Sequence, residues 1–446
     1  MTVVLREAAA EARLHSQRER LLLATLKVVA ERGYEATRVE DLLAASGVSR
    51  NAFYKVFGNK QECFLAAVDL VVELSGPSVL DVYGQTSGPW ECRMMAMLDA
   101  LAATVVEHPA AARVAWIEAY AAGDEAVRRV DRIDARTERI VRGALAESPE
   151  RAELPPETVR ALIGGVRKII HTRLREGCEH ELPGEMSQIL DWVLSYRTPP
   201  RRLRRPRRPP EGLVPPAPPT ESSRDRILAA VSELVAEKGY QSTAITEIAN
   251  RASVSLTTFY ELVPGKESAF LATMDAGRRR AIAAVLPVYR AAGDWPHAIA
   301  GGLHAFFALL SVDTALSRLG AIGAYESGHG GMESLDGAIA GAQTLLEPGF
   351  ELHPATPEIA AEAIGTSVYA LMSRQIRRRG PEYLYEVAPT AAFIALAPFV
   401  GSDEAARVAN AEPVSATASQ SVSSSVVLSL PRERAADRSR ARSSRW

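Results

Sequence analysis

Residues 18–69 read RERLLLATLKVVAERGYEATRVEDLLAASGVSRNAFYKVFGNKQECFLAAVD, and residues 224–275 read RDRILAAVSELVAEKGYQSTAITEIANRASVSLTTFYELVPGKESAFLATMD. The two stretches align without a gap, residue 18 on residue 224, at a constant offset of 206. Gly33-Tyr34 then falls on Gly239-Tyr240, and Phe53-Tyr54 falls on Phe259-Tyr260. A repeat of this length indicates one folded unit present in two copies.

Apolar residues recur at helical spacing almost throughout the chain, with no convincing alternating strand pattern, so we expect an all-α fold. In the first stretch, stop and capping residues divide this pattern into four helices. The predicted boundaries are a first helix from Ser16 or Gln17 to about Arg32 ended by Gly33, a second capped by Thr37 and broken by Gly47, a third capped by Ser49 and ending near Val56, and a fourth beginning at Asn59-Lys60. The second and third of these form a helix-turn-helix, whose second helix fits the major groove of DNA.

Both stretches closely resemble the DNA-binding domain of the tetracycline-repressor (TetR) family of bacterial transcription regulators. The resemblance rests on the Gly-Tyr stop, the Thr and Ser at helix starts, the Phe-Tyr pair and the Lys before the fourth helix, all present twice. It covers residues 16–76 and 222–282, with recognition motifs at about 39–58 and 245–264. The resemblance implies a three-helix DNA-binding head, a following helical domain that binds an effector and shifts the head, two-fold dimers and repression.

The rest of the chain follows the same duplication. The helical blocks 77–196 and 283–400 each contain a Pro-Glu pair that opens a helix, at Pro156 and Pro357, followed at equal spacing by Gly164 and Gly365. We therefore expect two tandem units, each a head followed by a helical-bundle effector and dimerisation domain. The Arg- and Pro-rich residues 197–221 are expected to form an extended linker, which is either a spacer or a contact to DNA phosphates. The Ser-, Ala- and Arg-rich residues 401–446 are expected to form a disordered tail.

Contacts to double-stranded DNA can be carried over from the family position by position. Arginine suits guanine and asparagine suits adenine, whereas threonine hydroxyls discriminate less between bases. The DNA-binding candidates are Thr37, Ser49, Arg50, Asn51, Tyr54, Lys55 and Lys60 in the first head, and Thr243, Ser255, Thr257, Thr258, Tyr260 and Lys266 in the second. The second head has Glu261 where the first has Lys55, and a carboxylate there repels phosphate, so the second head is expected to bind more weakly or to read another sequence.

An unknown small-molecule effector is a second expected partner. Aromatic residues at helical spacing usually belong to a core, but some in the helical blocks could line a pocket. The candidates are Trp116, Tyr120, His171, Tyr325, Tyr369 and Met372. The two units are expected to pair with each other within one chain, through helices at about 157–176 and 185–196 and at 358–379 and 382–399. An ordinary homodimer of chains is the competing arrangement.

Composition narrows the remaining possibilities. The eight histidines are scattered, and no HExxH, P-loop or GxSxG motif occurs, so we expect no enzyme, no metal site and no cofactor. Three widely spaced cysteines fit a reducing cytoplasm, and no uninterrupted apolar stretch of about 18 residues predicts a membrane span. The leading hypothesis is a cytoplasmic, DNA-binding transcriptional regulator. The alternative is a helical ligand-sensing or interaction protein in which only the first head binds DNA.

Overall fold

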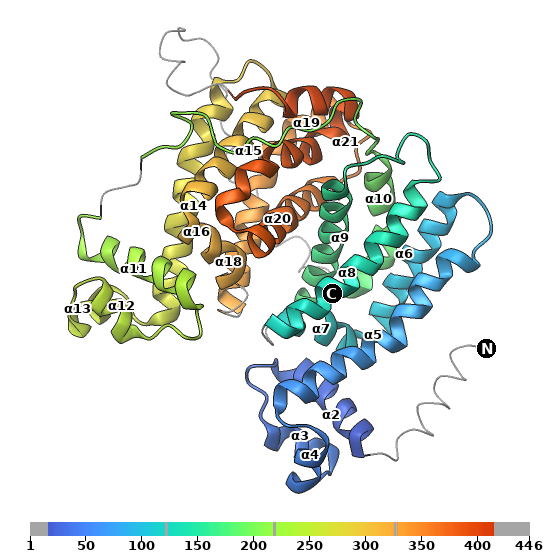
Figure 1. The fold of residues 1–446 in the computed structure, drawn as a ribbon, viewed down its shortest axis with the longest axis vertical. Coiled ribbons are helices and arrows are strands. Elements are labelled where there is room, and N and C mark those ends of the chain that lie inside the picture. The colour runs from blue at the N-terminus through green and yellow to red at the C-terminus, as the bar shows by residue number, and fades with distance from the viewer. Residues whose placement is uncertain (1–16, 121–123, 217–219, 325–326, 328, 414–446) are drawn as a thin grey trace, which may run out of the picture.

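The computed structural model describes residues 17–120, 124–216, 220–324, 327 and 329–413, and all regular secondary structure in them is helical (Figure 1). The predicted all-α fold is therefore confirmed for this part of the chain. Of the residues predicted to form the tail, 414–446 lie outside the described residues.

The first unit begins with a small head that carries the predicted helix-turn-helix. The head consists of α2 (Gln17–Arg32), α3 (Val39–Ser46), α4 (Arg50–Val56) and the start of α5 (Lys60–Gln85). The body that follows consists of α6 (Trp90–Glu107), α7 (Pro109–Trp116), η1 (Glu118–Tyr120), α8 (Asp124–Leu145), α9 (Pro156–Glu176), η2 (Glu179–Glu181) and α10 (Leu182–Leu194). The predicted boundaries of the head helices agree with these to within one residue.

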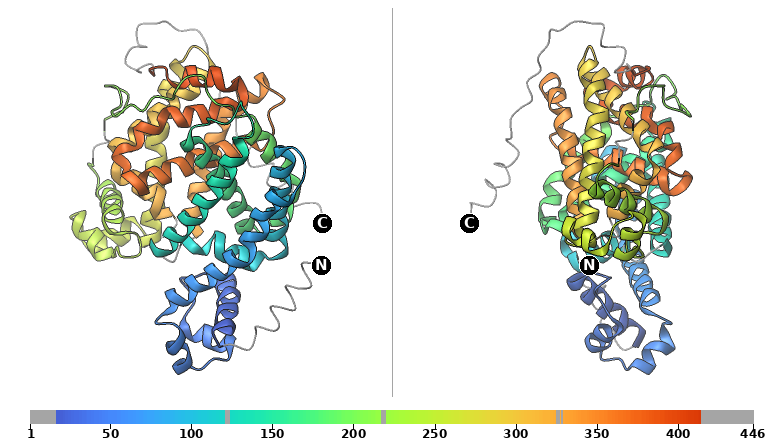
Figure 2. Two further views of the ribbon diagram at one scale, coloured as in Figure 1. Left: turned by 45° about the vertical axis from the view of Figure 1, so that its right-hand side comes forward. Right: turned by 90° about the vertical axis from the view of Figure 1, so that its left-hand side faces the viewer.

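The second unit repeats this order. Its head consists of α11 (Ser223–Lys238), α12 (Ile245–Arg251), α13 (Leu256–Leu262) and the start of α14 (Lys266–Ala291). Its body consists of α15 (Trp295–Val312), α16 (Thr314–Arg318), η3 (Leu319–Gly323), α18 (His329–Gln343), η4 (Thr344–Leu346), α19 (Glu347–Leu352), α20 (Ala360–Arg379), η5 (Pro381–Val387) and α21 (Ala388–Ala409). The first head lies at the lower end of the molecule in Figure 1 and the second at its left side, and the first protrudes from the body in both views of Figure 2.

The turn inside each helix-turn-helix has the same backbone form. Gly47 has φ 65° and lies between α3 and α4, and its equivalent Ser253 has φ 52° between α12 and α13. Among the described residues, Ser253 is the one residue other than glycine with positive φ. A left-handed conformation costs an L-residue roughly 1–2 kcal/mol, so the second head keeps this turn at a cost that glycine avoids in the first.

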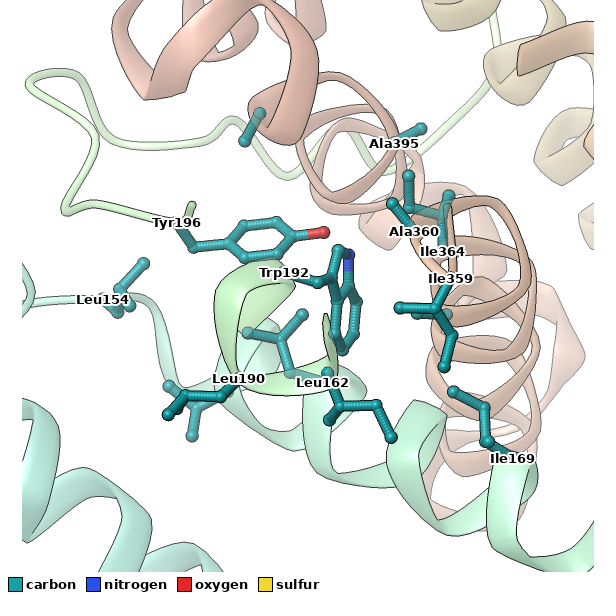
Figure 3. Close-up of a cluster of buried hydrophobic side chains, with 14 of the residues drawn as sticks. Leu154, Leu162, Ile169, Leu190, Trp192, Tyr196, Ile359, Ala360, Ile364 and Ala395 are labelled. Carbon is teal, nitrogen blue, oxygen red and sulfur yellow. The ribbon is translucent and has the colours of Figure 1, made fainter. Parts of the chain in front are cut away.

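The two bodies share one hydrophobic core. Helix α9 crosses α20 in the antiparallel sense, with Gly164 against Ala370 in the middle of the crossing and Arg173 paired with Glu362 towards one end. Figure 3 shows Leu162, Ile169, Leu190, Trp192 and Tyr196 of the first unit facing Ile359, Ala360, Ile364 and Ala395 of the second. The Tyr196 hydroxyl donates to the Ile394 carbonyl at 2.8 Å across the same boundary.

The linker, residues 197–221, is not helical up to residue 216, and it packs on the bodies. Leu203 and Leu213 are buried, and the Arg204 N–H donates to Asn410 Oδ1 at 2.7 Å. The Arg205 guanidinium pairs with Glu157 at the start of α9. In Figure 1 this segment runs over α15 and α21, at the end of the molecule away from α4.

The predicted start of the disordered tail at residue 401 is wrong. Gly401 has φ 78° and turns the chain inside α21, and the helix then continues to Ala409. Ala405, Ala406, Val408 and Ala409 are buried in the shared core. Small alanine side chains allow this close packing, although the composition of the segment is typical of disorder.

Within the part of the chain that the structure describes, two apolar helical segments are long enough to cross a membrane by length and composition alone. They are Trp295–Val312 and Pro381–Ala409, and 61% and 78% of their most apolar windows are buried inside the protein. This burial matches the role of α15 and α21 as central helices of the second body.

Candidate nucleic-acid interface

Each head is held together by the same internal contacts around its Gly-Tyr turn. The Lys60 ammonium donates to the carbonyls of Tyr34 and Thr37, at 2.9 and 3.0 Å, and lies 4.1 Å from the centre of the Tyr34 ring. Lys266 repeats the contacts to the tyrosine, with its ammonium 3.1 Å from the Tyr240 carbonyl and 4.3 Å from the ring centre, and its second acceptor is the Gln241 carbonyl at 3.5 Å. Burial lowers the pKa of both lysines. Both ammonium groups therefore act inside the head, where they fix the turn before the helix-turn-helix.

The expectation that Thr37 caps the second helix is wrong. Thr37 is 1% exposed, its hydroxyl donates back to the Gly33 carbonyl at 2.7 Å, and its N–H donates to the Tyr34 carbonyl. Arg38 takes the N-cap position instead, and Asp41 accepts its N–H at 2.8 Å. Thr243 is buried in the same way, with its hydroxyl 2.8 Å from the Gly239 carbonyl. Since both donors of Thr37 are used internally, we assign it a structural role in the turn.

Helix α4 presents a polar and basic surface to solvent. Ser49 caps this helix as predicted and accepts the Ala52 N–H at 3.3 Å. Phe53 is fully buried and anchors the inner face of the helix. The outward-facing side chains are exposed, and they are Arg50, Asn51, Tyr54 and Lys55. These four predicted residues therefore form one continuous surface on the helix that would enter a groove.

Helix α13 has the same frame and a different surface. Ser255 caps it and accepts the Thr258 N–H at 3.0 Å, and Phe259 is fully buried. Thr257 and Tyr260 are exposed, whereas Thr258 is half-buried and its hydroxyl lies 2.9 Å from Ser255 Oγ. The remaining exposed side chains of this helix include Leu256 and Glu261. The second surface is therefore less polar at its start and acidic at its end.

An ion pair within the first head involves one predicted base contact. Arg50 pairs with Glu40 on α3, and both side chains are more than half exposed. The position equivalent to Glu40 in the second head is Thr246, which has no charge. Exposed pairs of this kind are worth about 0–1 kcal/mol, so Arg50 can exchange Glu40 for a base or phosphate at little cost.

Glu118 links the first head to its body, and sequence reasoning missed it. Its carboxylate accepts the Tyr34 N–H at 2.7 Å, directly beside the turn that Lys60 holds. The aligned position in the second unit, counted from the equivalent residues Tyr120 and Tyr325, is Gly323, which packs against Phe270 and Val235. Because this difference between the copies is visible in the sequence, it could have drawn attention to Glu118. Its partner, 84 residues away, could not have been inferred from it.

Glu118 gives the first testable prediction, which concerns pH. Burial raises the pKa of Glu118 above its usual value of 4.5, against the opposing effect of the Tyr34 N–H. Since the folded pKa lies above the unfolded one, this group contributes most to stability below pH 4.5 and loses that contribution as pH rises through the folded value. Glu118→Gln keeps an acceptor for Tyr34 but cannot ionise. We therefore expect the melting temperature of the variant to rise relative to wild type as pH increases from about 4 to about 7.

Thermal denaturation of both proteins across this pH range measures the effect. Glu31→Gln, an exposed change on α2, is the control for the loss of one carboxylate from the first head. A pH-independent difference for Glu118→Gln would show that this carboxyl does not titrate with folding.

The predicted effector-pocket residues mostly lie in packed regions. The Arg167 guanidinium covers the half-buried Trp116 ring at 4.8 Å, and His171 is buried beside Lys168. Tyr369 and Met372 are buried in the core of the second unit. The Tyr120 side chain and Tyr325 lie outside the described residues.

Cavities lie elsewhere in the described part of the chain. A cavity of about 360 Å³ lies between α9, the linker, α20 and η5, and a smaller one of about 220 Å³ lies between α15 and the end of α21. None of the predicted pocket residues lines either of these two cavities. Among the described residues, no group of three or more His, Cys, Asp and Glu side chains is placed to hold a metal ion.

Comparison with known proteins agrees with the geometry of the first head. Residues 21–67 match the family of bacterial regulatory proteins described as the tetR family. Similar proteins include the uncharacterized HTH-type transcriptional regulator YezE of Bacillus subtilis, 36% identical over 56 residues, and the HTH-type transcriptional activator FasR of Mycolicibacterium smegmatis, 28% identical over 101 residues. The matches cover 13% and 23% of this chain and 29% and 46% of the relatives, so the chain spans less than half the length of either. The chain therefore carries one TetR-type DNA-binding domain and is similar to regulators of that family.

Among solved structures, the fatty acid degradation regulator FadR of Bacillus halodurans is similar over 40% of this chain and 97% of its own, at 16% identity and a TM-score of 0.35. A likeness of this size does not bear on fold or function.

Proposed function

We propose that the chain is a cytoplasmic transcriptional regulator whose two TetR-like units pair within one polypeptide and read two unlike DNA half-sites. The observation that carries this proposal is the repetition of the internal contacts of the first head in residues 222–282. Thr243 and Ser255 make the hydrogen bonds of Thr37 and Ser49, and Lys266 keeps the bond of Lys60 to the tyrosine carbonyl, with lengths that differ by at most 0.3 Å between the two heads. A second head that had lost DNA binding would not need to keep these hydrogen bonds. Their presence in residues 222–282 therefore supports a second head that binds DNA.

The contact between the two bodies supports pairing within the chain. Helices α9 and α10 of the first unit lie against α20 and α21 of the second, and the predicted dimerisation helices fall on these four elements. Paired heads then meet successive major grooves about 34 Å apart. Because α4 presents Arg50 and Asn51 where α13 presents Leu256 and Thr257, the preferred site is two unlike half-sites.

The effector and the direction of regulation complete the proposal. We propose a small molecule that shifts the heads, and repression as the family resemblance implies, although FasR is named an activator. A reporter gene placed behind a selected site measures the direction. Expression that rises when the protein is added would replace repression with activation and leave the DNA-binding proposal intact.

A second candidate function rests on the surface of α13. Leu256 is 45% exposed there, and Glu261 places a carboxylate where Lys55 lies in the first head. These features favour a protein in which only the first head binds DNA. The test of the two functions uses the full chain, because separating the two units into fragments would expose the core that their bodies share.

The test selects bound sequences from random duplex DNA and measures the mass of the free protein. We expect the full chain to select a site with two unlike halves, and light scattering to give a mass near 48 kDa, which is one chain. Changing Leu256 and Thr257 to alanine should then relax the preference in one half only. A mass of two chains together with a palindromic selected site would contradict pairing within the chain. A single half-site would support the second candidate function.

A further inference from the structure

The two ends of the crossing of α9 and α20 are related by the duplication of the chain. A glutamate at the first end is replaced by an alanine at the second. Aligning Pro156 with Pro357 places Arg173 on Arg374, Glu185 on Glu386, and Ala161 on Glu362. At the first end, Arg173 donates to Glu185 at 2.9 Å and to Glu362 at 2.8 Å. This end of the crossing is closed by two carboxylates around one guanidinium.

At the second end, the equivalent of Glu362 is Ala161, and a cavity lies there. The cavity of about 360 Å³ is lined by Ala161 together with Arg374 and Glu386. Ala161 is buried, and its methyl group cannot replace the carboxylate present at the first end. The larger cavity therefore lies where the repeat of the first end would place an anionic group.

The wall of this cavity is positively charged, as the binding of an anionic group requires. Five arginines and two glutamates line it, and the arginines are Arg160, Arg205, Arg374, Arg378 and Arg379. Arg160 also pairs with Glu138 on α8 at 2.7 Å, so the lining residues and this neighbour together carry an excess of two positive charges. Glu157 pairs with Arg205, and Glu386 pairs with Arg379, so the two carboxylates of the wall already have partners. Leu371 and Val387 add a buried apolar side. Guanidinium groups bind carboxylates and phosphates through paired hydrogen bonds.

We propose that this cavity binds a small organic anion that carries a carboxylate or phosphate group and a short apolar part. Its wall is built from α9 of the first unit, α20 and η5 of the second, and Arg205 of the linker. A bound anion therefore joins all three segments and strengthens the pairing of the two bodies. This regulatory consequence rests on the proposed pairing, whereas the binding itself does not.

The experiment titrates the full chain, without DNA and at low salt, with four probes by calorimetry. Pyrophosphate and ribose 5-phosphate represent phosphates, and succinate and hexanoate represent carboxylates, so the two sources of the anionic group are distinguished. We expect at least one probe to bind with a Kd of about 1 mM or tighter and to raise the melting temperature. Arg374→Gln and Arg378→Gln should each weaken binding about tenfold, since each removes a charged donor. Arg378 is exposed, so its variant should fold even if Arg374→Gln does not.

Two further variants make the test specific. Arg377→Gln changes the exposed neighbour that does not line the cavity, and it should bind like wild type. Ala161→Glu supplies the missing carboxylate, so it should abolish anion binding and give the free protein the melting temperature of the bound wild type. Binding that is unchanged in Arg378→Gln and in Ala161→Glu would overturn the proposal.

The arginines of this cavity could instead contact the phosphates of DNA. If none of the four probes binds, and Arg378→Gln weakens binding to duplex DNA, the surface is a DNA contact and the proposal is wrong. A chain that binds no DNA at all would contradict the proposed function. The titration with small anions would still test whether the cavity binds an anion, because it uses no DNA.

Discussion

Replacing Gly165 with leucine is expected to lower the free energy of unfolding by about 1–3 kcal/mol and to disrupt the pairing of the two units. A Cβ atom at Gly165 would lie 2.1 Å from Ser367 Oγ and 3.0 Å from the Ala363 carbonyl oxygen. Because the Ala363 carbonyl belongs to the backbone of α20, rotation of one side chain cannot remove the conflict. The helices must move apart, and the core shared by the two bodies must open with them.

Chemical denaturation of the full chain measures this loss, and Gly143→Leu is the matched control. Gly143 is a helical glycine on α8, and a Cβ atom there would meet nothing within 4 Å. Leucine also has a higher helix propensity than glycine, by up to about 1 kcal/mol, so the control should be neutral or stabilising. Equal losses in the two variants would show that the crossing of α9 and α20 does not depend on close approach.

A reciprocal pair of changes tests the same crossing by rescue. A Cβ atom at Gly164 would lie 2.5 Å from the Ala370 Cβ atom, with other atoms farther away. Gly164→Ala alone should therefore destabilise the chain, and adding Ala370→Gly should recover most of the loss, because the methyl group has only changed sides. A double variant no more stable than Gly164→Ala would contradict this packing.

The heads could be predicted from the sequence almost residue by residue, because local signals define them. Gly33 and Gly47 end helices through their own positive φ, of 80° and 65°, and Ser49 caps α4 through a bond three residues away. The N-cap of α3 is Arg38 and not the predicted Thr37, and the reason for this difference is also local. A threonine hydroxyl can bond forward as an N-cap or back to a preceding carbonyl, and Thr37 bonds back to Gly33.

The bodies were less predictable because distant residues define their interactions. Arg173 and Glu362 are 189 residues apart, and their pairing depends on the angle and register at which α9 meets α20. The spacing of apolar residues predicts where these helices begin and end, but it does not predict the register in which α9 packs against α20. The segment after Gly401 has the composition of a disordered tail, and composition alone does not show that its alanines pack into the core shared by the two bodies.

Giving α13 the recognition residues of α4 is expected to change the preferred DNA site from two unlike halves to a palindrome. The variant combines Leu256→Arg, Thr257→Asn and Glu261→Lys, which are the residues at the aligned positions 50, 51 and 55. Leu256, Thr257 and Glu261 are exposed. Ser255 caps the start of the helix and Phe259 anchors its buried face, so the helix should accept the new side chains without losing its position. Each new bidentate pair of hydrogen bonds to a base is worth about 1–3 kcal/mol of discrimination between bases.

Selection from random duplex DNA, followed by affinity measurements at several salt concentrations, gives the outcome. The variant should bind its palindrome more tightly than wild type does. The lysine at position 261 should also steepen the slope of log affinity against log salt by about 0.9, since it neutralises one more phosphate. As a control, Leu256→Ala with Thr257→Ala supplies no new donors and should loosen the second half-site without creating a palindrome.

The same variant separates the two candidate functions of the second head. If this head meets a groove whenever the first does, new donors on α13 must find base edges, and the selected site must change in that half alone. If the head does not reach DNA, the variant will select the wild-type site with unchanged affinity. That result would leave residues 222–282 with the architecture of a DNA-binding head and without its function.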